Sequence, residues 1–136
     1  MIWVSEIPDK VFTRLKGNFS KALKTEYKMT NSNFSSSAFS DTPSVFPFVC
    51  LKLLQPSEVG QDLEGTSING ALFTFQVDVT DNASETTAKA VSDEVLRIMK
   101  KYGFDAVGMP YPDTSTKGSY RIVSRYRRTI GANDTL

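Results

Sequence analysis

The segment between residues 70 and 80 constrains the fold of this chain more than any other. Its apolar residues alternate strictly with polar ones: Phe73, Phe75, Val77 and Val79 stand between Thr74, Gln76, Asp78 and Thr80. Successive side chains of a β-strand point to opposite faces, so this period of two predicts a strand with one apolar and one polar face. A half-buried strand of this kind is typical of an antiparallel sheet that is covered on one side.

Two segments have the periodicity of an α-helix and could supply that cover. Residues 5–28 place an apolar side chain at every fourth position: Val11, Leu15, Phe19 and Leu23. Residues 84–102 carry a broader apolar stripe: Ala88, Val91, Val95, Ile98, Met99 and Tyr102. Gly103 follows the second stripe as a natural left-handed C-cap. We therefore expect two helices, each burying one apolar stripe.

Three further segments predict strands. Residues 45–54 are almost continuously apolar, which is typical of a strand buried on both faces. Residues 104–110 are a short strand candidate, and residues 119–130 form the last strand. The first of these strands could pair with residues 70–80 as a wide hairpin. The segments rich in serine, asparagine, proline or glycine are expected to be loops and turns: 29–44, 55–69 and 110–118.

This order of elements predicts an α+β fold, with a mainly antiparallel central sheet of about four to five strands flanked by two helices. The length of 136 residues suits one domain, which we expect to span residues 1–136. A chain of this length can bury one substantial core.

The residue types that are missing exclude several functions. The chain has no histidine and one cysteine, Cys50. This excludes Ser-His-Asp and Cys-His catalysis, imidazole zinc sites, intrachain disulfides and CxxC sites. No Walker, GxGxxG or metal-loop pattern is present. We therefore expect no enzyme, no cofactor, no metal and no small-molecule substrate, with Cys50 a buried structural thiol in a reduced, cytosolic protein.

The sequence also argues against two other classes of protein. A hydrolase that uses carboxylates alone would need a facing pair, but Asp62 with Glu64, and Asp93 with Glu94, are too close in sequence to face one cleft. A membrane protein would need an apolar run of about 20 residues, and none exists, so we expect no membrane association.

The net charge of +1 hides a strong pattern along the chain. Residues 1–52 carry seven basic and four acidic groups, residues 53–96 one basic and eight acidic groups, and residues 97–136 eight basic and three acidic groups. If the fold keeps these segments apart, the surface is polarised, and polarised subunits can associate head-to-tail. If the fold mixes them, the surface is uniform.

Four arginines crowd the last predicted strand: Arg121, Arg125, Arg127 and Arg128. Together with Tyr120 and Tyr126 they could bind a nucleic acid, because aromatic rings stack on bases while arginines hold the backbone. Two other interpretations are an edge strand protected by charge and a subunit interface that uses arginine.

The chain also has a familiar overall pattern. Four segments carry it, and they occur in this order: Val45-Phe46-Pro47-Phe48-Val49, Gly70-Ala71-Leu72-Phe73-Thr74-Phe75-Gln76-Val77-Asp78-Val79, Ile98-Met99-Lys100-Lys101-Tyr102-Gly103-Phe104 and Tyr120-Arg121-Ile122-Val123-Ser124-Arg125-Tyr126-Arg127-Arg128. With the N-terminal amphipathic helix, this order resembles the tail terminator and tail-completion proteins of long-tailed bacteriophages, prophages and phage-tail-like particles. The resemblance covers residues 8–130 and consists of element order and hydrophobic rhythm.

The resemblance implies a structural role without a cofactor. Such a protein forms a hexameric ring on the last ring of tail-tube subunits, ends tube polymerisation and offers a docking face to the head–tail connector protein. Its partners would be its own copies, the tail-tube protein and the connector, with DNA only as cargo passing through the lumen. It would be assembled in the cytoplasm of a bacterial host and reside in the virion tail.

Under this hypothesis, charged residues would form the contacts between subunits or with the tube. The basic candidates are Arg121, Arg125, Arg127 and Arg128, and the acidic candidates are Glu58, Asp62 and Glu64. The acidic loop 55–69 would face a neighbouring subunit or the lumen. A head–tail connector or minor capsid component is the alternative within the same class. A small nucleic-acid-binding module that uses the arginine-rich strand is the alternative from another class.

Overall fold

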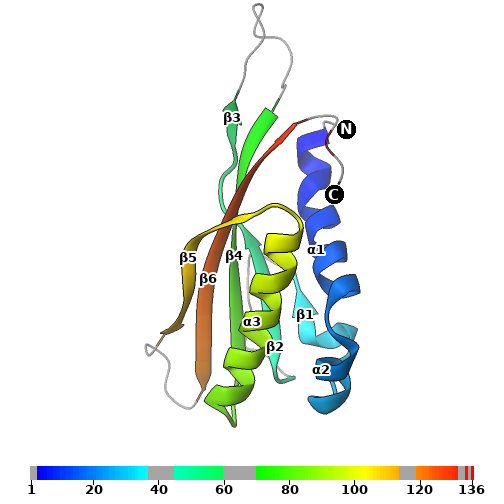
Figure 1. Ribbon diagram of the computed structural model, residues 1–136, viewed down its shortest axis with the longest axis vertical. Helices are drawn as coiled ribbons and strands as arrows, with labels where there is room; N and C mark the ends of the chain where they lie inside the picture. The colour runs from blue at the N-terminus through cyan, green and yellow to red at the C-terminus, as the bar shows by residue number, and fades with distance from the viewer. Residues whose placement is uncertain (1–2, 37–44, 60–69, 114–118, 132–133, 135) are drawn as a thin grey trace, which may run out of the picture.

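The computed structural model describes residues 3–36, 45–59, 70–113, 119–131, 134 and 136. Six strands form one sheet (Figure 1): β1 (Phe34–Ser35), β2 (Phe48–Leu53), β3 (Ser57–Val59), β4 (Gly70–Asp81), β5 (Asp105–Asp113) and β6 (Tyr120–Gly131). The strand order is β1-β2-β4-β6-β5, and β3 also pairs with β4. Among the described strands, β1 and β2 are the one parallel pair. The predicted α+β fold with a mainly antiparallel sheet is confirmed. The sheet has six described strands instead of the predicted four to five, because the short strands β1 and β3 were not expected.

Strand β4 lies at the centre of this sheet. It pairs along its length with β6 on one side, and with β2 and β3 on the other. The side chains of Phe73, Phe75, Val77 and Val79 are at most 1% exposed, as the alternating pattern predicts. The expected pairing of residues 45–54 with residues 70–80 is also present, since β2 runs antiparallel to β4.

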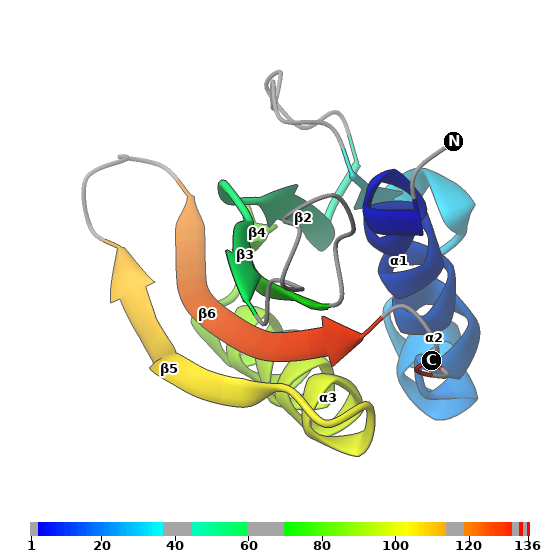
Figure 2. The ribbon, with the colours of Figure 1, turned by 90° about the horizontal axis from the view of Figure 1, so that it is seen from above.

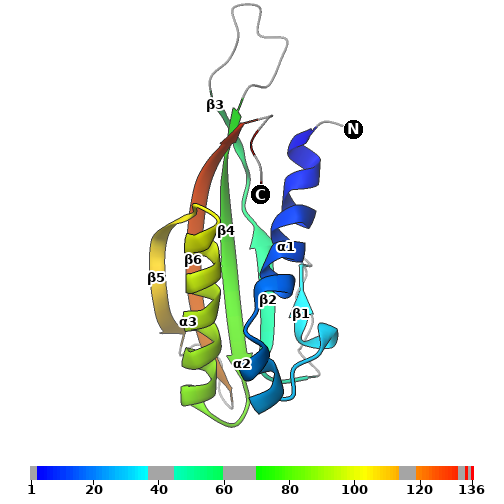
Figure 3. The ribbon, with the colours of Figure 1, turned by 45° about the vertical axis from the view of Figure 1, so that its right-hand side comes forward.

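The helices cover one face of the sheet. Helices α1 (Ile7–Asn18) and α3 (Glu85–Lys101) lie next to each other on that face (Figures 2 and 3). Between them and the sheet lies the apolar core, in which the ring of Phe75 packs edge-on against Phe104 and stacks beside Phe73. No helix of the described residues lies on the opposite face, which we call the helix-free face.

The single helix predicted for residues 5–28 is wrong, because the chain breaks it into three pieces. A 3-10 turn, η1 (Trp3–Glu6), leads into α1, and a short helix, α2 (Lys21–Glu26), follows a break at Phe19 and Ser20. Both residues of the break leave the helical conformation, with ψ angles of 138° at Phe19 and 127° at Ser20. The break is held from outside the helix, since the backbone N–H of Ser20 donates to Glu94 Oε2 on α3 at 2.8 Å.

Helix α3 confirms the prediction for residues 84–102. The Ser84 side chain caps its first turn by accepting from the backbone N–H of Thr87. Gly103 follows the helix with a φ of +84°, a left-handed conformation that an L side chain rarely adopts. Its buried residues are those of the predicted stripe except Tyr102, with Ser92 and Glu94 in addition; Tyr102 is the C-cap residue and is half-buried.

Three predicted loops contain strand or helical structure. In the segment 29–44, the short 3-10 helix η2 (Asn31–Asn33) precedes β1, and the Asn33 side chain donates to the backbone oxygen of Pro47 at 2.7 Å. In the segment 55–69, β3 pairs with β4. In the segment 110–118, the turn predicted around Pro110 and Pro112 is wrong, because β5 continues through both prolines to Asp113.

The core prediction can be tested at Phe75. We expect Phe75→Ala to lower the free energy of unfolding by about 3–5 kcal/mol, because it removes a fully buried ring from a packed aromatic cluster. Urea unfolding followed by circular dichroism measures the loss. The neighbouring Thr74→Ala, on the helix-free face, serves as control and should change stability by about 0.5 kcal/mol or less. Equal losses for both variants would contradict the assignment of the two faces.

Candidate functional site

The helix-free face carries the polar residues of the alternating pattern in β4, such as Thr74, Gln76 and Asp78. The strand register places Cys50, Asp78 and Val123 side by side across β2, β4 and β6. The next row contains Lys52, Gln76 and Arg125. Residues that face each other directly in a sheet share one face, so this surface is built by strands alone.

A buried carboxylate lies at the centre of this face. Asp78 is 5% exposed, and its Oδ2 lies 2.7 Å from both Lys52 Nζ and Arg121 Nη2. Gln76 Nε2 donates to Asp78 Oδ1 at 3.0 Å. Arg121 extends the network to β5, because its Nη1 lies 3.0 Å from Asp113 Oδ2. The network therefore links all four long strands of the sheet.

The electrostatics of Asp78 favour a structural role. Burial alone would raise the pKa of this carboxyl group, but the hydrogen bonds from Lys52, Arg121 and Gln76 outweigh burial and lower it. Asp78 is thus ionised at neutral pH and already satisfied by its partners. Such a group is neither a proton donor nor a free base. It acts as a cross-link between strands.

Cys50 lies beside this network and is buried, as predicted from the sequence. Burial raises the pKa of its thiol, and the nearby Asp78 charge acts in the same direction, while Lys52 and Arg121 oppose them. The thiolate is the reactive form of cysteine, so this environment suits a structural thiol.

The structure separates the four predicted interface arginines. Arg121 belongs to the Asp78 network, and Arg128 points to the helix side, where its Nη1 donates to the backbone oxygen of Tyr102 at 2.8 Å. Arg125 is exposed on the helix-free face, and its Nε donates to Gln76 Oε1 at 3.1 Å. Arg127 is exposed on the same face, and its side chain makes no hydrogen bond or ion pair to another described residue. Two of the four arginines are therefore available to a partner.

The strand that carries these arginines is not an edge. Strand β6 lies between β4 and β5, which contradicts the interpretation of an edge protected by charge. Sequence periodicity could not show this, because the order of strands in a sheet depends on contacts between distant segments.

The acidic candidates divide in a similar way. Glu58 is exposed on β3, whereas Asp62 and Glu64 lie outside the described residues. The structure describes six of the eight acidic groups between residues 53 and 96, and three of these six are buried: Asp78, Asp81 and Glu94. Asp81 Oδ2 accepts from the backbone N–H groups that precede α3, and Glu94 holds Ser20 and Arg97. Half of the described negative charge of this segment therefore stabilises the fold instead of forming an acidic surface.

Exposed apolar side chains on β5 were missed by sequence reasoning. This strand forms one edge of the sheet and exposes Val107 by 46%, Met109 by 62% and Tyr111 by 52%. The sequence does contain a signal, because these three residues alternate with Gly108, Pro110 and Pro112. Prolines commonly mark turns, and that rule led to the wrong interpretation. We call Val107, Met109 and Tyr111 the β5 edge.

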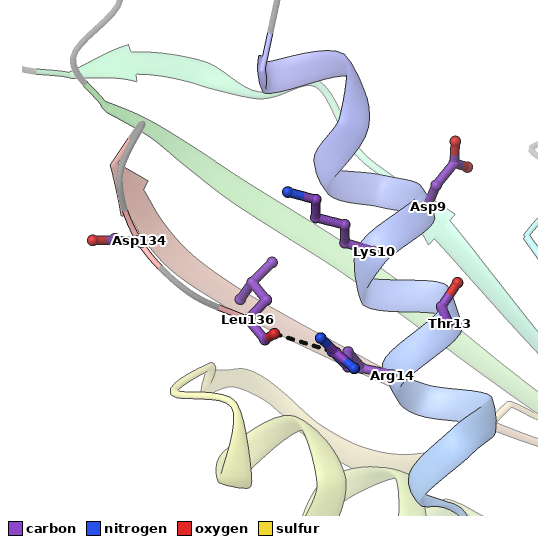
Figure 4. A pocket seen from close by; sticks show the side chains of 6 residues that line it. All are labelled: Asp9, Lys10, Thr13, Arg14, Asp134 and Leu136. Atoms are coloured by element: carbon purple, nitrogen blue, oxygen red, sulfur yellow. Dashed lines mark hydrogen bonds between the residues drawn. The ribbon is translucent and has the colours of Figure 1, made fainter.

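The described residues show no obvious site for a metal or a substrate. They contain no group of three or more histidine, cysteine, aspartate or glutamate residues that could hold a metal ion. An open depression beside α1 is lined by Asp9, Lys10, Thr13, Arg14, Asp134 and Leu136 (Figure 4). Arg14 Nε donates to the backbone oxygen of Leu136 at 3.0 Å, and the other charged side chains point in different directions. The depression therefore does not assemble a converging acid–base pair.

None of the helices in the described ranges is long and apolar enough to cross a membrane.

The role of Asp78 leads to a pH-dependent prediction. We expect Asp78→Asn to lower the free energy of unfolding at pH 7 by about 2–3 kcal/mol, because it leaves two cations without their anion at a partly solvated site. The pKa of Asp78 is lowered in the folded state, so its contribution is complete above the unfolded-state pKa of about 3.9 and is lost as the pH falls through the folded-state value.

Urea unfolding at several pH values tests this prediction. The difference in stability between wild type and Asp78→Asn should be constant from pH 7 to about pH 4 and should shrink below it. The exposed Asp93→Asn is the control and should change stability by about 0.5 kcal/mol or less. A difference that stays the same at low pH would show that the Asp78 charge does not stabilise the fold.

No protein-family model matches this chain, and no curated protein does so either. The resemblance to tail terminators therefore depends on the order and rhythm of the sequence segments and stays a prediction. The structure adds two observations that bear on function. The helix-free face carries two exposed arginines, Arg125 and Arg127, and the edge strand β5 exposes three large apolar side chains.

Proposed function

We propose that this protein is a structural virion assembly protein whose copies form a closed ring that caps the tube of a long phage tail. The ring ends tube polymerisation and provides the docking interface for the head. The observation that carries the proposal is the β5 edge, where three large apolar side chains are between 46% and 62% exposed on one strand. Large apolar side chains exposed together on a sheet edge are a feature of surfaces that contact another protein.

The backbone of β5 suits a specific contact better than open-ended strand addition. Pro110 and Pro112 have no N–H group to donate, and the pairing of β5 with β6 shifts register at two places. Prolines and bulges are devices that prevent one sheet edge from adding further strands. The exposed side chains of β5 remain available for packing, which favours a contact made by side chains.

The helix-free face supports the same role. The Asp78 network holds β2, β4, β6 and β5 together through charged hydrogen bonds, so the surface is preformed. A preformed surface loses less conformational entropy when it binds a partner. Arg125 and Arg127 lie on this surface next to β5 and can contact acidic groups of a neighbouring subunit or of the tube.

A head–tail connector or minor capsid component is the alternative within the class. Such a protein would also self-associate, but its rings would bind the head vertex and not the end of a tube. Purified tail tubes distinguish the two, because a terminator added to them stops their elongation and a connector does not.

Self-association gives the direct test. We expect the wild-type protein to form closed rings of about six copies at high concentration, seen by light scattering and electron microscopy. Met109→Lys should raise the concentration for half-assembly by at least about tenfold, because it places a charge in the apolar contact. Tyr120→Lys is the matched control, since Tyr120 is 44% exposed but lies on the inner strand β6. A wild-type protein that is monomeric at every concentration would contradict ring formation without a template.

One observation favours a second candidate, a nucleic-acid-binding module. Tyr111 lies opposite Val123 on the helix-free face, the face that also carries the exposed Arg125 and Arg127. An aromatic ring beside arginines can bind single strands by stacking and by phosphate contacts.

Binding to a short single-stranded DNA across a salt series separates the two candidates. If the protein is an assembly subunit, we expect no binding at low salt. Micromolar binding that falls steeply with salt, and that Arg125→Ala and Arg127→Ala together abolish, would favour the module and contradict the assembly role as the main function.

A further inference from the structure

The side chain of Arg125 is exposed, yet it is held at two points. Its neighbours across the sheet are Gln76 on β4 and Gly108 on β5. Its Nε donates to Gln76 Oε1 at 3.1 Å. A Cβ added to Gly108 would lie 3.4 Å from the Cβ of Arg125 and 3.7 Å from its Cγ, so the stem of the arginine packs against the backbone of this glycine. Both the stem and the Nε end of the side chain therefore have a fixed neighbour.

Gln76 is fixed in turn by the buried network. Its Nε2 donates to Asp78 Oδ1 at 3.0 Å, while its Oε1 accepts from Arg125. An ionised carboxylate only accepts hydrogen bonds and a guanidinium only donates them, so the amide of Gln76 fits in one orientation. Asp78 is itself held by Lys52 and Arg121. The orientation of Arg125 thus depends on a chain of bonds that begins in the sheet.

The other end of the guanidinium is available to a ligand. Neither Nη atom of Arg125 has a hydrogen bond or an ion pair with another described residue. The two Nη groups form a planar fork whose N–H donors match the two oxygens of a carboxylate or a phosphate. A mobile arginine loses side-chain freedom when it binds such a group, whereas a side chain that is already held loses less.

The neighbouring charges favour one carboxylate over a nucleic-acid backbone. The direct neighbours of Arg125 are both uncharged, but Arg127 lies opposite Asp105, and Arg121 lies opposite Asp113. The Asp105 side chain is 82% exposed. A chain of phosphates that crossed Arg125 along the sheet would pass these carboxylates, and like charges disfavour such a contact. A single carboxylate has to reach Arg125 alone.

We infer that Arg125 is a preformed binding site for a single carboxylate group of a protein partner, and that Gln76 is the residue that positions it. Gly108 lies between Val107 and Met109, whose exposed apolar side chains can pack on the partner around that carboxylate. The inference rests on the proposed function for the identity of the partner, since a neighbouring subunit or the tail tube would supply the acidic side chain.

The mobility of the arginine side chains tests the positioning role. In the ¹⁵N-labelled wild type, we expect an NMR order parameter of about 0.8 or more for the Nε–H group of Arg125, and below about 0.6 for that of Arg127. Gln76→Leu should lower the value of Arg125 to that of Arg127. Thr74→Ala is the matched control, because Thr74 lies opposite Arg127 as Gln76 lies opposite Arg125. It should leave Arg125 unchanged.

A titration with sodium acetate at neutral pH tests the ligand, with sodium chloride of equal ionic strength as reference. We expect the side-chain NMR signals of Arg125 to shift and saturate with acetate, and those of Arg127 to shift less. Gln76→Leu should weaken acetate binding at Arg125 by about two- to tenfold, because the freed side chain must then be ordered on binding. The variant has to keep the wild-type circular dichroism spectrum, and the comparison of the two arginines in the wild type needs no variant.

The outcomes separate this inference from the proposed ring. Equal mobility of Arg125 and Arg127, or equal shifts of both with acetate, would overturn the inference even if the protein assembles into rings. A selective response of Arg125 in a protein that never assembles would support the carboxylate site and count against the ring. Shifts of Arg125 with micromolar single-stranded DNA would overturn the assignment of a carboxylate as the ligand.

Discussion

The burial of one face of β4 under α1 and α3 is the constraint on which the rest of this structure depends. Phe73, Phe75, Val77 and Val79 need an apolar cover, and both helices supply it from the same side. The alternating residues then have to face away from the helices. Polar side chains such as Thr74 and Gln76 suit that position, and no helix is needed there. A sheet covered on one side keeps its second face and its borders available, which is a useful property for an assembly subunit.

The buried carboxylate of Asp78 changes what that second face can do. Burying an ion pair costs desolvation free energy, and an apolar residue could fill the same place as stably. The arrangement instead fixes the positions of Lys52 and Arg121 and connects four strands through directional bonds. It therefore makes the face rigid while leaving its outer surface polar. Of the charged groups that sequence reasoning assigned to an interface, Arg121 serves this internal purpose.

Strong local periodicity explains what could be predicted from the sequence. Helix α3 and strand β4 were predicted nearly to the residue, because their patterns, caps and Gly103 all agree. The break at Ser20 was not predictable, since the apolar stripe continues through it and the bond that holds it comes from Glu94 on another helix. Strands β1 and β3 have two and three residues and depend on their neighbours for pairing. The separation of Arg128 from the other arginines follows from the alternation of side chains along β6. The apolar edge on β5 was not recognised, because Pro110 and Pro112 indicated a turn.

The exposed β5 edge also indicates how strong the proposed assembly can be. A contact through this edge would cover three apolar side chains that are between 46% and 62% exposed in the free subunit. At roughly 1 kcal/mol for each partly exposed side chain, their burial contributes about 3 kcal/mol. This is less than the cost of association, about 4 to 15 kcal/mol. A single pair of copies should therefore associate weakly. A closed ring gives every subunit two contacts, and a tube end that holds several copies raises their effective concentration. Under the proposed function, assembly on a template is therefore expected at a lower protein concentration than the closed rings that form in free solution.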